Sequence, residues 1–89
     1  MVYLLVHHQI EDYKVWRPFF DEHEGMRKKN GAVSAKVFQK ADDPQDVSIL
    51  FEWDSEANAR RFVESTDLRE VMKRAGVIGM PEATFLKAA

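Results

Sequence analysis

The sequence predicts an α+β domain of the ferredoxin-like class, in which helices cover one face of a four-stranded antiparallel sheet. Two observations predict this fold. Apolar residues alternate along several short segments, as in strands, and recur at steps of three and four between them, as in helices. The resulting order is β-α-β-β-α(α)-β. Because the chain shows no linker, repeat or low-complexity segment, we expect a single domain over residues 1–89.

The N-terminal third predicts a strand followed by a long helix. Val2 to Ile10 alternates, and both of its faces are apolar in the first half, so we expect both to become covered. Asp12 is suited to cap the helix, and Asn30-Gly31 is a strong stop signal. Pro18 removes a helical hydrogen bond, which predicts an irregularity near Lys14 to Pro18.

One face of this predicted helix is unusually aromatic and also carries a histidine. Its members recur at steps of three and four: Trp16, Phe19, Phe20, His23, Met26 and Arg27. Such a stripe is the side of a helix that faces the interior. We expect it to line any pocket that the protein has.

The middle of the chain predicts a β-hairpin. Val33 to Lys40 and Val47 to Trp53 both alternate, and the second of these is the clearest strand pattern in the chain. Between them, Ala41 to Asp46 is dense in turn-forming residues. This segment predicts an exposed hairpin loop.

The C-terminal third predicts two short helices and a last strand. Asp54 or Ser55 can cap a helix over Glu56 to Glu64. Ser65-Thr66-Asp67 then interrupts it, and Asp67 with Glu70 resembles a new capping box. The second apolar stripe comprises Leu68, Val71, Met72 and Ala75, and Gly76 ends it. The remaining segments predict a loop over Val77 to Pro81 and a strand over Glu82 to Lys87.

Two helical segments can cover only one side of such a sheet. The other side keeps large apolar residues from the first and third strands, and a large exposed apolar patch is unusual on a monomer. A second copy packed sheet against sheet would cover it. We therefore expect a homodimer formed through the open sheet face.

Composition excludes several classes of protein. The chain has no cysteine, so disulfides, thiolate metal sites and cysteine nucleophiles are excluded. It lacks the features of a signal peptide and any apolar stretch of membrane-spanning length, so we expect a cytoplasmic protein. A net charge of −2 gives no general attraction to nucleic acid or to an anionic membrane.

The histidines leave several chemistries open. His7 and His8 point to opposite faces of one strand and cannot chelate together, whereas His8 could approach the His23 side of the helix. Two imidazoles in an aromatic pocket could bind a metal or haem iron, polarise an oxygen, or move a proton. Alternatively, each is simply hydrogen-bonded at a cavity rim. No third ligand is evident, so we expect no metal site.

The remaining side chains of interest are aromatic or charged. The aromatic set could surround a planar ligand or could pack a tight core: Tyr13, Trp16, Phe20, Phe51 and Trp53. The charged groups show no catalytic spacing, so we interpret them as solvated surface: Asp21, Glu22, Glu52, Arg27-Lys28-Lys29 and Arg60-Arg61. No phosphate-binding loop, nucleophile elbow or metalloprotease motif occurs.

These residues also carry a resemblance over essentially the whole chain. The positions concerned are His8, Asp12-Tyr13, Trp16, Phe20-Asp21, His23, Arg27, Gly31, Pro44, Glu52, Trp53-Asp54, Ala59, Phe62, Leu68, Met72 and Gly76-Val77. In them the chain resembles small bacterial proteins of the dimeric α+β barrel superfamily. Some of these are described as cyclases, and they are related in fold to the antibiotic biosynthesis monooxygenases.

The resemblance implies a homodimer whose subunits each keep a pocket between sheet and helices. It implies that His8 and His23 are the catalytic candidates, and that Tyr13, Trp16, Phe20 and Phe51 contact a small aromatic or hydrophobic ligand. Members of the superfamily oxidise polycyclic aromatic substrates without a cofactor, bind haem, or bind small aromatic metabolites. The asparagine, tryptophan and histidine set of the haem-degrading members has no match here, so we expect no cofactor.

Three functions therefore remain for comparison with the structure. The first is a cofactor-independent monooxygenase or cyclase acting on an aromatic or polyketide-like compound. The second is a non-catalytic dimeric ligand-binding or stress-associated protein that uses the same pocket. The third is an RNA-recognition module, which shares this order of elements but needs basic residues beside exposed aromatics, and the VSILFEW strand has none.

Overall fold

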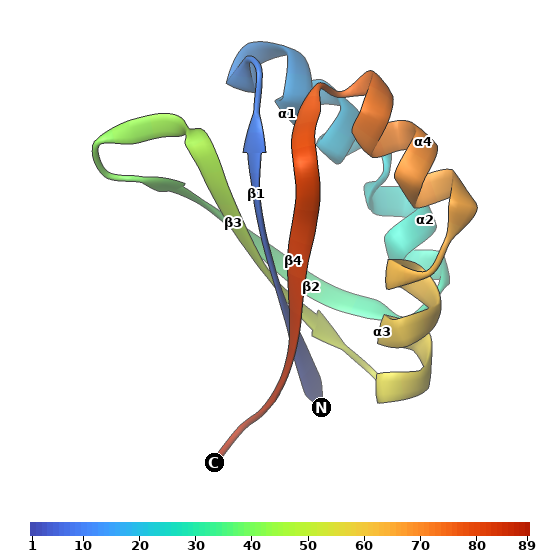
Figure 1. Cartoon of the computed structure of the whole chain (residues 1–89). Helices are drawn as coiled ribbons and strands as arrows, with labels where there is room; N and C mark the ends of the chain where they lie inside the picture. Colours follow the sequence, from blue (N-terminus) through green and yellow to red (C-terminus); the bar gives the residue numbers. More distant parts are fainter.

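The computed structural model describes all of residues 1–89 and confirms the ferredoxin-like fold (Figure 1). Its elements in chain order are β1 (Val2–Ile10), α1 (Tyr13–Glu22), α2 (Glu24–Lys29), β2 (Ala32–Lys40), β3 (Asp43–Trp53), α3 (Glu56–Val63), α4 (Thr66–Arg74) and β4 (Val77–Lys87). The strands form one antiparallel sheet in the order β2-β3-β1-β4. None of the helices has the length and apolar character needed to cross a membrane.

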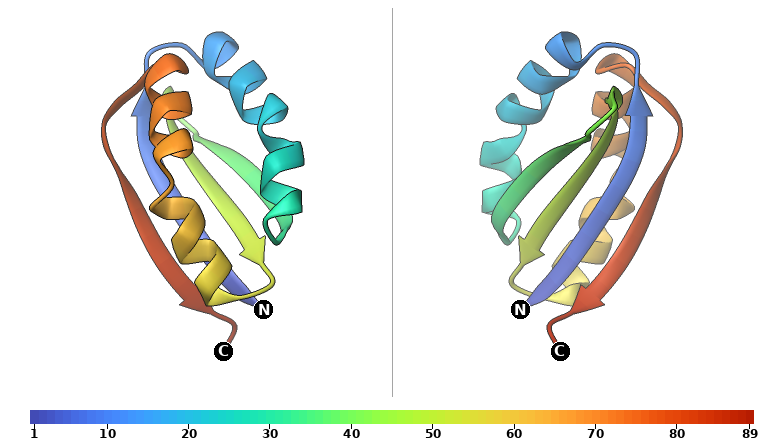
Figure 2. Two further views of the ribbon diagram at one scale, coloured as in Figure 1. Left: turned by 90° about the vertical axis from the view of Figure 1, so that its right-hand side faces the viewer. Right: turned by 90° about the vertical axis from the view of Figure 1, so that its left-hand side faces the viewer.

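The helices form two pairs on the same face of the sheet. α1 with α2 lies over one side of that face and α3 with α4 lies over the other, while the opposite face is bare of helices (Figure 2). This arrangement confirms the two-layer architecture that the pattern of the sequence predicts. It leaves β1 and β3 at the centre of the sheet, each with a neighbour on both edges.

The core lies between the central strands and the helices. Alternate residues of β1 and β3 point toward the helices, and the register pairs Leu4 with Phe51 and Val6 with Ile49. The buried hydrophobic residues are Val2, Leu4, Val6, Ile10, Trp16, Val47, Ile49, Phe51, Trp53, Ala59 and Ala75. The opposite faces of the same two strands are only half-buried. The sheet therefore has one packed face and one open face.

The long first helix of the prediction is two helices, and its irregularity lies at a different residue. Asp12 caps α1 as expected, with its carboxylate accepting a hydrogen bond of 3.0 Å from the Lys14 N–H. Pro18 lies inside α1 without ending it, and both Pro18 and Lys14 are exposed, so water can satisfy the unpaired Lys14 carbonyl. The break falls instead at His23, where α1 ends and α2 begins.

Two predicted loops are mostly strand. The hairpin turn contains only Ala41 and Asp42, because β3 already pairs with β2 at Asp43 through a shift of register. β4 begins at Val77 rather than Glu82, because another register shift accommodates the Gly79–Pro81 segment within the β1–β4 pairing. The sequence pattern did not predict either extension, since apolar residues do not alternate along these irregularly paired segments.

Both C-terminal helices form close to their predicted ranges, although α3 ends at Val63 rather than Glu64 and α4 begins before its predicted cap at Asp67. Ser55 caps α3 by accepting a hydrogen bond of 3.2 Å from the Asn58 N–H. α4 begins at Thr66, and its cap is Ser65, whose hydroxyl accepts from the Leu68 N–H at 3.3 Å. The predicted capping box at Asp67 is wrong, because the serine two residues earlier already supplies the acceptor.

Gly31 offers a stability test of the junction between α2 and β2. Its φ of +113° is in the left-handed region, and a methyl group there would lie 2.5 Å from Asp54 Oδ1 and 2.8 Å from Asn58 Nδ2. We predict that Gly31→Ala lowers the free energy of unfolding by roughly 2–4 kcal/mol in urea titrations, through backbone strain and this repulsion. A methyl group added at the helical Gly25 would meet nothing within 4 Å, so Gly25→Ala is the control and raises stability by about 0.5–1 kcal/mol. Equal effects of the two substitutions would contradict this account.

Candidate functional site

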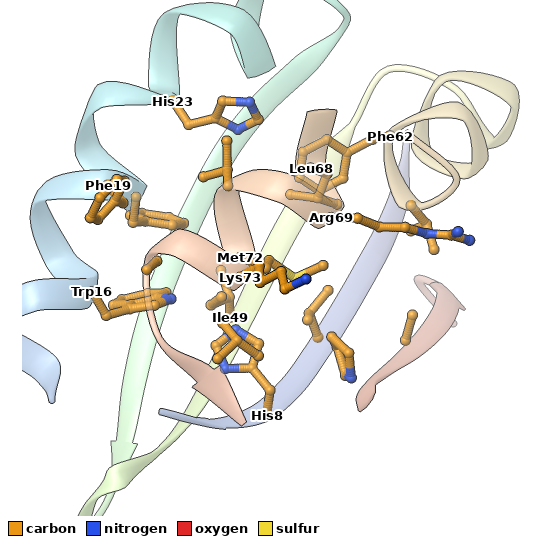
Figure 3. A pocket seen from close by; sticks show the side chains of 18 of the residues that line it. His8, Trp16, Phe19, His23, Ile49, Phe62, Leu68, Arg69, Met72 and Lys73 are labelled. Carbon is orange, nitrogen blue, oxygen red and sulfur yellow. The ribbon is translucent and has the colours of Figure 1, made fainter. Parts of the chain in front are cut away.

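A cavity of about 580 Å³ opens between the sheet and the helices (Figure 3). Its lining comes from β1, β3 and β4 on the sheet side and from α1 and α4, with contributions from α2 and α3, on the helix side. Of the 22 residues that line it, 15 are hydrophobic. This is the size and character of a site for a small organic molecule.

The central strands and α1 supply the aromatic part of the lining. Trp16 and Phe20, one turn apart on α1, stack with ring centroids 5.0 Å apart and an interplanar angle of 21°. The ring centroids of Phe20 and Phe51 of β3 lie 6.3 Å apart, and those of Phe51 and Phe62 of α3 lie 5.4 Å apart. These four rings form a continuous aromatic seam from α1 across β3 to α3. Flat apolar surfaces of this kind can contact the faces of a planar ligand.

α4 and the irregular part of β4 supply the rest of the lining. Leu68 and Met72, one turn apart, present their side chains toward the cavity (Figure 3). Met80 also belongs to the lining, although it is 92 % exposed. Sequence reading found the α4 stripe but did not assign it to the pocket. It missed Met80 entirely, because the segment carries no pattern that distinguishes a cavity wall from a solvent loop.

His8 lies buried in the lining, beside Trp16. It is 4 % exposed, its ring meets that of Trp16 edge-on at 5.8 Å, and its Nδ1 atom is buried without a hydrogen-bond partner. Burial lowers the pKa of His8 below its ordinary value of 6.5, and the neighbouring His7 lowers it further. His8 is therefore a neutral imidazole at neutral pH and can accept a proton.

His23 lines the same cavity at the junction of α1 and α2. Its ring lies 6.3 Å from that of Phe62, and its Nε2 atom is buried without a hydrogen-bond partner. Burial lowers the pKa of His23, and the positive charge of Arg27 lowers it further. Buried polar atoms are rarely left unpartnered in proteins, so each ring retains one nitrogen with unused hydrogen-bonding capacity.

The two imidazoles do not act on one point. Figure 3 shows His8 and His23 at opposite ends of the cavity, with Ile49, Leu68 and Met72 in the region between them. Nowhere in the chain do three or more His, Asp or Glu side chains gather into a group that could hold a metal ion. The shared metal or iron site considered from the sequence is therefore not formed by this pair.

Some residues of the predicted aromatic set lie elsewhere. Tyr13, predicted to contact the ligand, does not line the cavity; its ring packs 5.8 Å from that of Trp16 and its hydroxyl accepts from Arg17 at 3.0 Å. Trp53 is completely buried in the core and also lies outside the lining. Met26, placed on the interior face by its spacing, is exposed because the helix breaks at His23. The cavity contains the other predicted residues, His8, Trp16, Phe20, His23 and Phe51.

The sequence supported two interpretations of Arg27. Its place on the aromatic helix face predicted that it lines the pocket, whereas its place in a basic run predicted solvated surface. It is only 4 % exposed and lines the cavity. One guanidinium N–H donates to the Phe20 carbonyl at 2.9 Å, and the guanidinium lies 4.0 Å from the centre of the Phe20 ring. Its spacing from Trp16, Phe20 and His23 is the signal that indicated its position on the cavity wall.

Several solved structures match this fold, and some of them are described as oxygenases. An antibiotic biosynthesis monooxygenase matches with a TM-score of 0.76 and 15 % identity, covering 100 % of this chain and 99 % of that one. SnoaB, a cofactor-independent oxygenase from Streptomyces nogalater, matches with a TM-score of 0.79 and 12 % identity, covering 99 % and 92 %. Rv0793 from Mycobacterium tuberculosis matches with a TM-score of 0.73 and 12 % identity, covering 99 % and 94 %.

These likenesses establish the fold. The chain adopts the α+β fold of the antibiotic biosynthesis monooxygenases, as the sequence resemblance implied. At the level of sequence, no family model and no curated protein matches it. Because identities of this size do not carry function with the fold, the activity has to be argued from the site itself.

The lowered pKa values of the two histidines predict acid sensitivity. In the unfolded chain these histidines bind protons near their ordinary pKa of 6.5, whereas in the folded chain they bind protons only at lower pH. The free energy of unfolding therefore falls as the pH drops from 6.5 toward the lowered pKa values of the folded state. We predict that urea-unfolding free energies fall between about pH 7 and about pH 5 and that this fall is smaller in His8→Gln. An identical pH profile in the variant and the parent would contradict a buried neutral His8.

Proposed function

We propose that this protein binds a planar aromatic or polyketide-like compound in the cavity and oxidises it with O₂ without a cofactor. The observation that carries the proposal is the combination, in one cavity, of an aromatic lining and a buried neutral imidazole with a free ring nitrogen. The likeness in fold to SnoaB, described as a cofactor-independent oxygenase, supports the class of reaction.

The geometry supports a division of roles between ring contacts and proton transfer. Trp16 and Phe20 would contact the rings of the ligand, since both of these nearly parallel rings line the cavity. His8 would accept the proton of a phenol or enol, because its lowered pKa keeps it neutral at neutral pH. The apolar walls exclude water from the resulting anion, which favours its reaction.

Proton removal makes such a reaction possible without a cofactor. A phenolate or enolate is electron-rich enough to transfer an electron directly to O₂. In the overall reaction the activated carbon, which is a CH₂ group in the keto form of the phenol or enol, becomes a carbonyl: one oxygen atom of O₂ enters the product, and the other leaves as water with the two hydrogens. The protein would contribute binding, orientation and a base, and O₂ is the only co-reactant.

A non-catalytic ligand-binding protein is the second candidate. The separation of His8 and His23 favours it, because the second imidazole does not stand beside the first. In this alternative the unused ring nitrogens would only form hydrogen bonds with the ligand. It predicts that a polycyclic phenol binds to the cavity and leaves unchanged.

The role of His8 can be tested by oxygen consumption with a panel of polycyclic phenols. We predict that His8→Gln lowers turnover roughly 10²- to 10⁴-fold, the usual contribution of a general base, while ligand binding persists. His7→Gln is the matched control, because His7 lies on the other face of the same strand and pairs with Asp46 at 2.7 Å. Full turnover in a folded His8→Gln would refute the catalytic role. Binding without turnover in the parent protein would favour the second candidate.

We also propose that the protein functions as a homodimer through its open sheet face. Apolar side chains of all four strands share this face, as the strand register shows: Tyr3, Leu5, Phe38, Leu50 and Leu86. Phe38 and Leu86 are exposed in the single chain. Covering such a patch with a second copy removes apolar surface from water, which is the main driving force for association.

The dimer predicts a clear response to a charge at the centre of this face. We expect Leu50→Lys to convert a dimer into a folded monomer in light scattering coupled to size exclusion, because the lysine would be buried against the partner copy. Val15→Lys, on the exposed side of α1, is the control and should remain dimeric. A parent protein that is monomeric at all concentrations would contradict the proposal.

A further inference from the structure

The charged side chains that line the cavity all have the same sign. They are Arg27, Arg69 and Lys73, and no aspartate or glutamate lines the cavity at all. The chain as a whole has an excess of acidic residues, 15 against 13 basic ones. The positive lining is therefore a local reversal of the charge of the molecule.

Arg27 is the buried member of this set, and its charge has no partner. Burial of an ion is costly unless a counter-ion or several hydrogen bonds compensate for it. The two carboxylates whose charges act on Arg27, Glu24 and Asp21, form their ion pairs elsewhere, Asp21 with Arg17 at 3.0 Å and Glu24 with Lys28 at 3.0 Å. Neither of them, nor any other carboxylate, forms an ion pair with Arg27.

The contacts that Arg27 does make leave most of its donors free. A guanidinium has five N–H groups. The only side-chain hydrogen bond of Arg27 is the one to the Phe20 carbonyl, at 2.9 Å. Its guanidinium carbon lies 4.0 Å from the centre of the Phe20 ring and 5.8 Å from the centre of the Phe51 ring. Arg27 is thus a charged group with spare donors, placed against the aromatic seam.

Arg69 and Lys73 extend the positive charge to the surface. They lie four residues apart on α4, both are exposed, and neither forms an ion pair (Figure 3). Exposed cations beside the opening of an apolar cavity raise the local concentration of anions. The cavity therefore has cations at its surface and one cation within its lining.

We propose that the natural ligand is an aromatic anion, with its rings against Trp16 and Phe20 and its acidic group on the guanidinium of Arg27. This inference deepens the proposed function and depends on it, because it assumes that the cavity binds an aromatic compound. A carboxylate or a similar planar oxyanion suits the fork of a guanidinium, which can bind two oxygens at once. The ligand would supply the counter-ion that the protein does not.

A purely structural role for Arg27 is the competing explanation. Its hydrogen bond to Phe20 crosses the break between α1 and α2, so it could simply hold the two helices together. Loss of such a role would disturb the cavity for every ligand alike. Loss of an anion site would affect only charged ligands.

A pair of dyes with one skeleton separates the two roles. 8-Anilinonaphthalene-1-sulfonate is an aromatic anion, and N-phenyl-1-naphthylamine is its neutral counterpart. Fluorescence titrations with both dyes would compare the parent protein with Arg27→Met, Arg27→Lys and Lys28→Met. The last is the control, since it removes the same charge from an exposed neighbour that already pairs with Glu24. Near-ultraviolet circular dichroism would confirm that each variant stays folded.

We expect Arg27→Met to weaken binding of the anionic dye roughly tenfold to a hundredfold, as for loss of a charged hydrogen-bond partner. Arg27→Met should bind the neutral dye as tightly as the parent does. Arg27→Lys should retain part of the parent's preference for the anionic dye, and Lys28→Met should bind both dyes like the parent. Equal binding of the anion by Arg27→Met and the parent, or equal loss of both dyes, would overturn the anion site. If the folded parent binds neither dye, the proposed aromatic cavity itself fails.

Discussion

The aromatic seam is the interaction on which the rest of this structure depends. Trp16, Phe20, Phe51 and Phe62 contact one another in sequence and so join α1, the centre of the sheet and α3. Trp53 is completely buried, and its ring centroid lies 5.0 Å from that of Phe62, so it continues this packing into the core. Because large rings bury much apolar surface each, a few of them can fix two helix pairs on a sheet of this size.

The same packing explains why an 89-residue chain can keep a cavity. Stability comes from the rings and from the buried aliphatic residues of β1 and β3, so the space bordered by α4 need not be filled. The cavity then receives three groups of a kind that a core normally avoids or pairs: the neutral imidazoles of His8 and His23, and the cation of Arg27. Their presence in the lining of one cavity supports our interpretation of it as a binding site rather than as imperfect packing.

The sequence predicts the fold well because the signals for it are local. Alternation identifies β1 and most of β3, and the capping residues Asp12 and Ser55 locate two helix starts. The site is predicted less completely. His8, Trp16, Phe20, His23 and Phe51 were found because they share predicted faces. The same helix face included Arg27, but the burial of its charge and the contribution of α4 were not predicted, since both depend on tertiary packing.

The most direct test of the central claim, that the cavity is the ligand site, uses the two tryptophans as internal probes. Trp16 lines the cavity, whereas Trp53 is buried outside it. In an NMR titration with a polycyclic aromatic acid, the indole N–H signal of Trp16 should shift strongly and that of Trp53 should change little. Shifts confined to residues of the open sheet face, with Trp16 unaffected, would contradict the account.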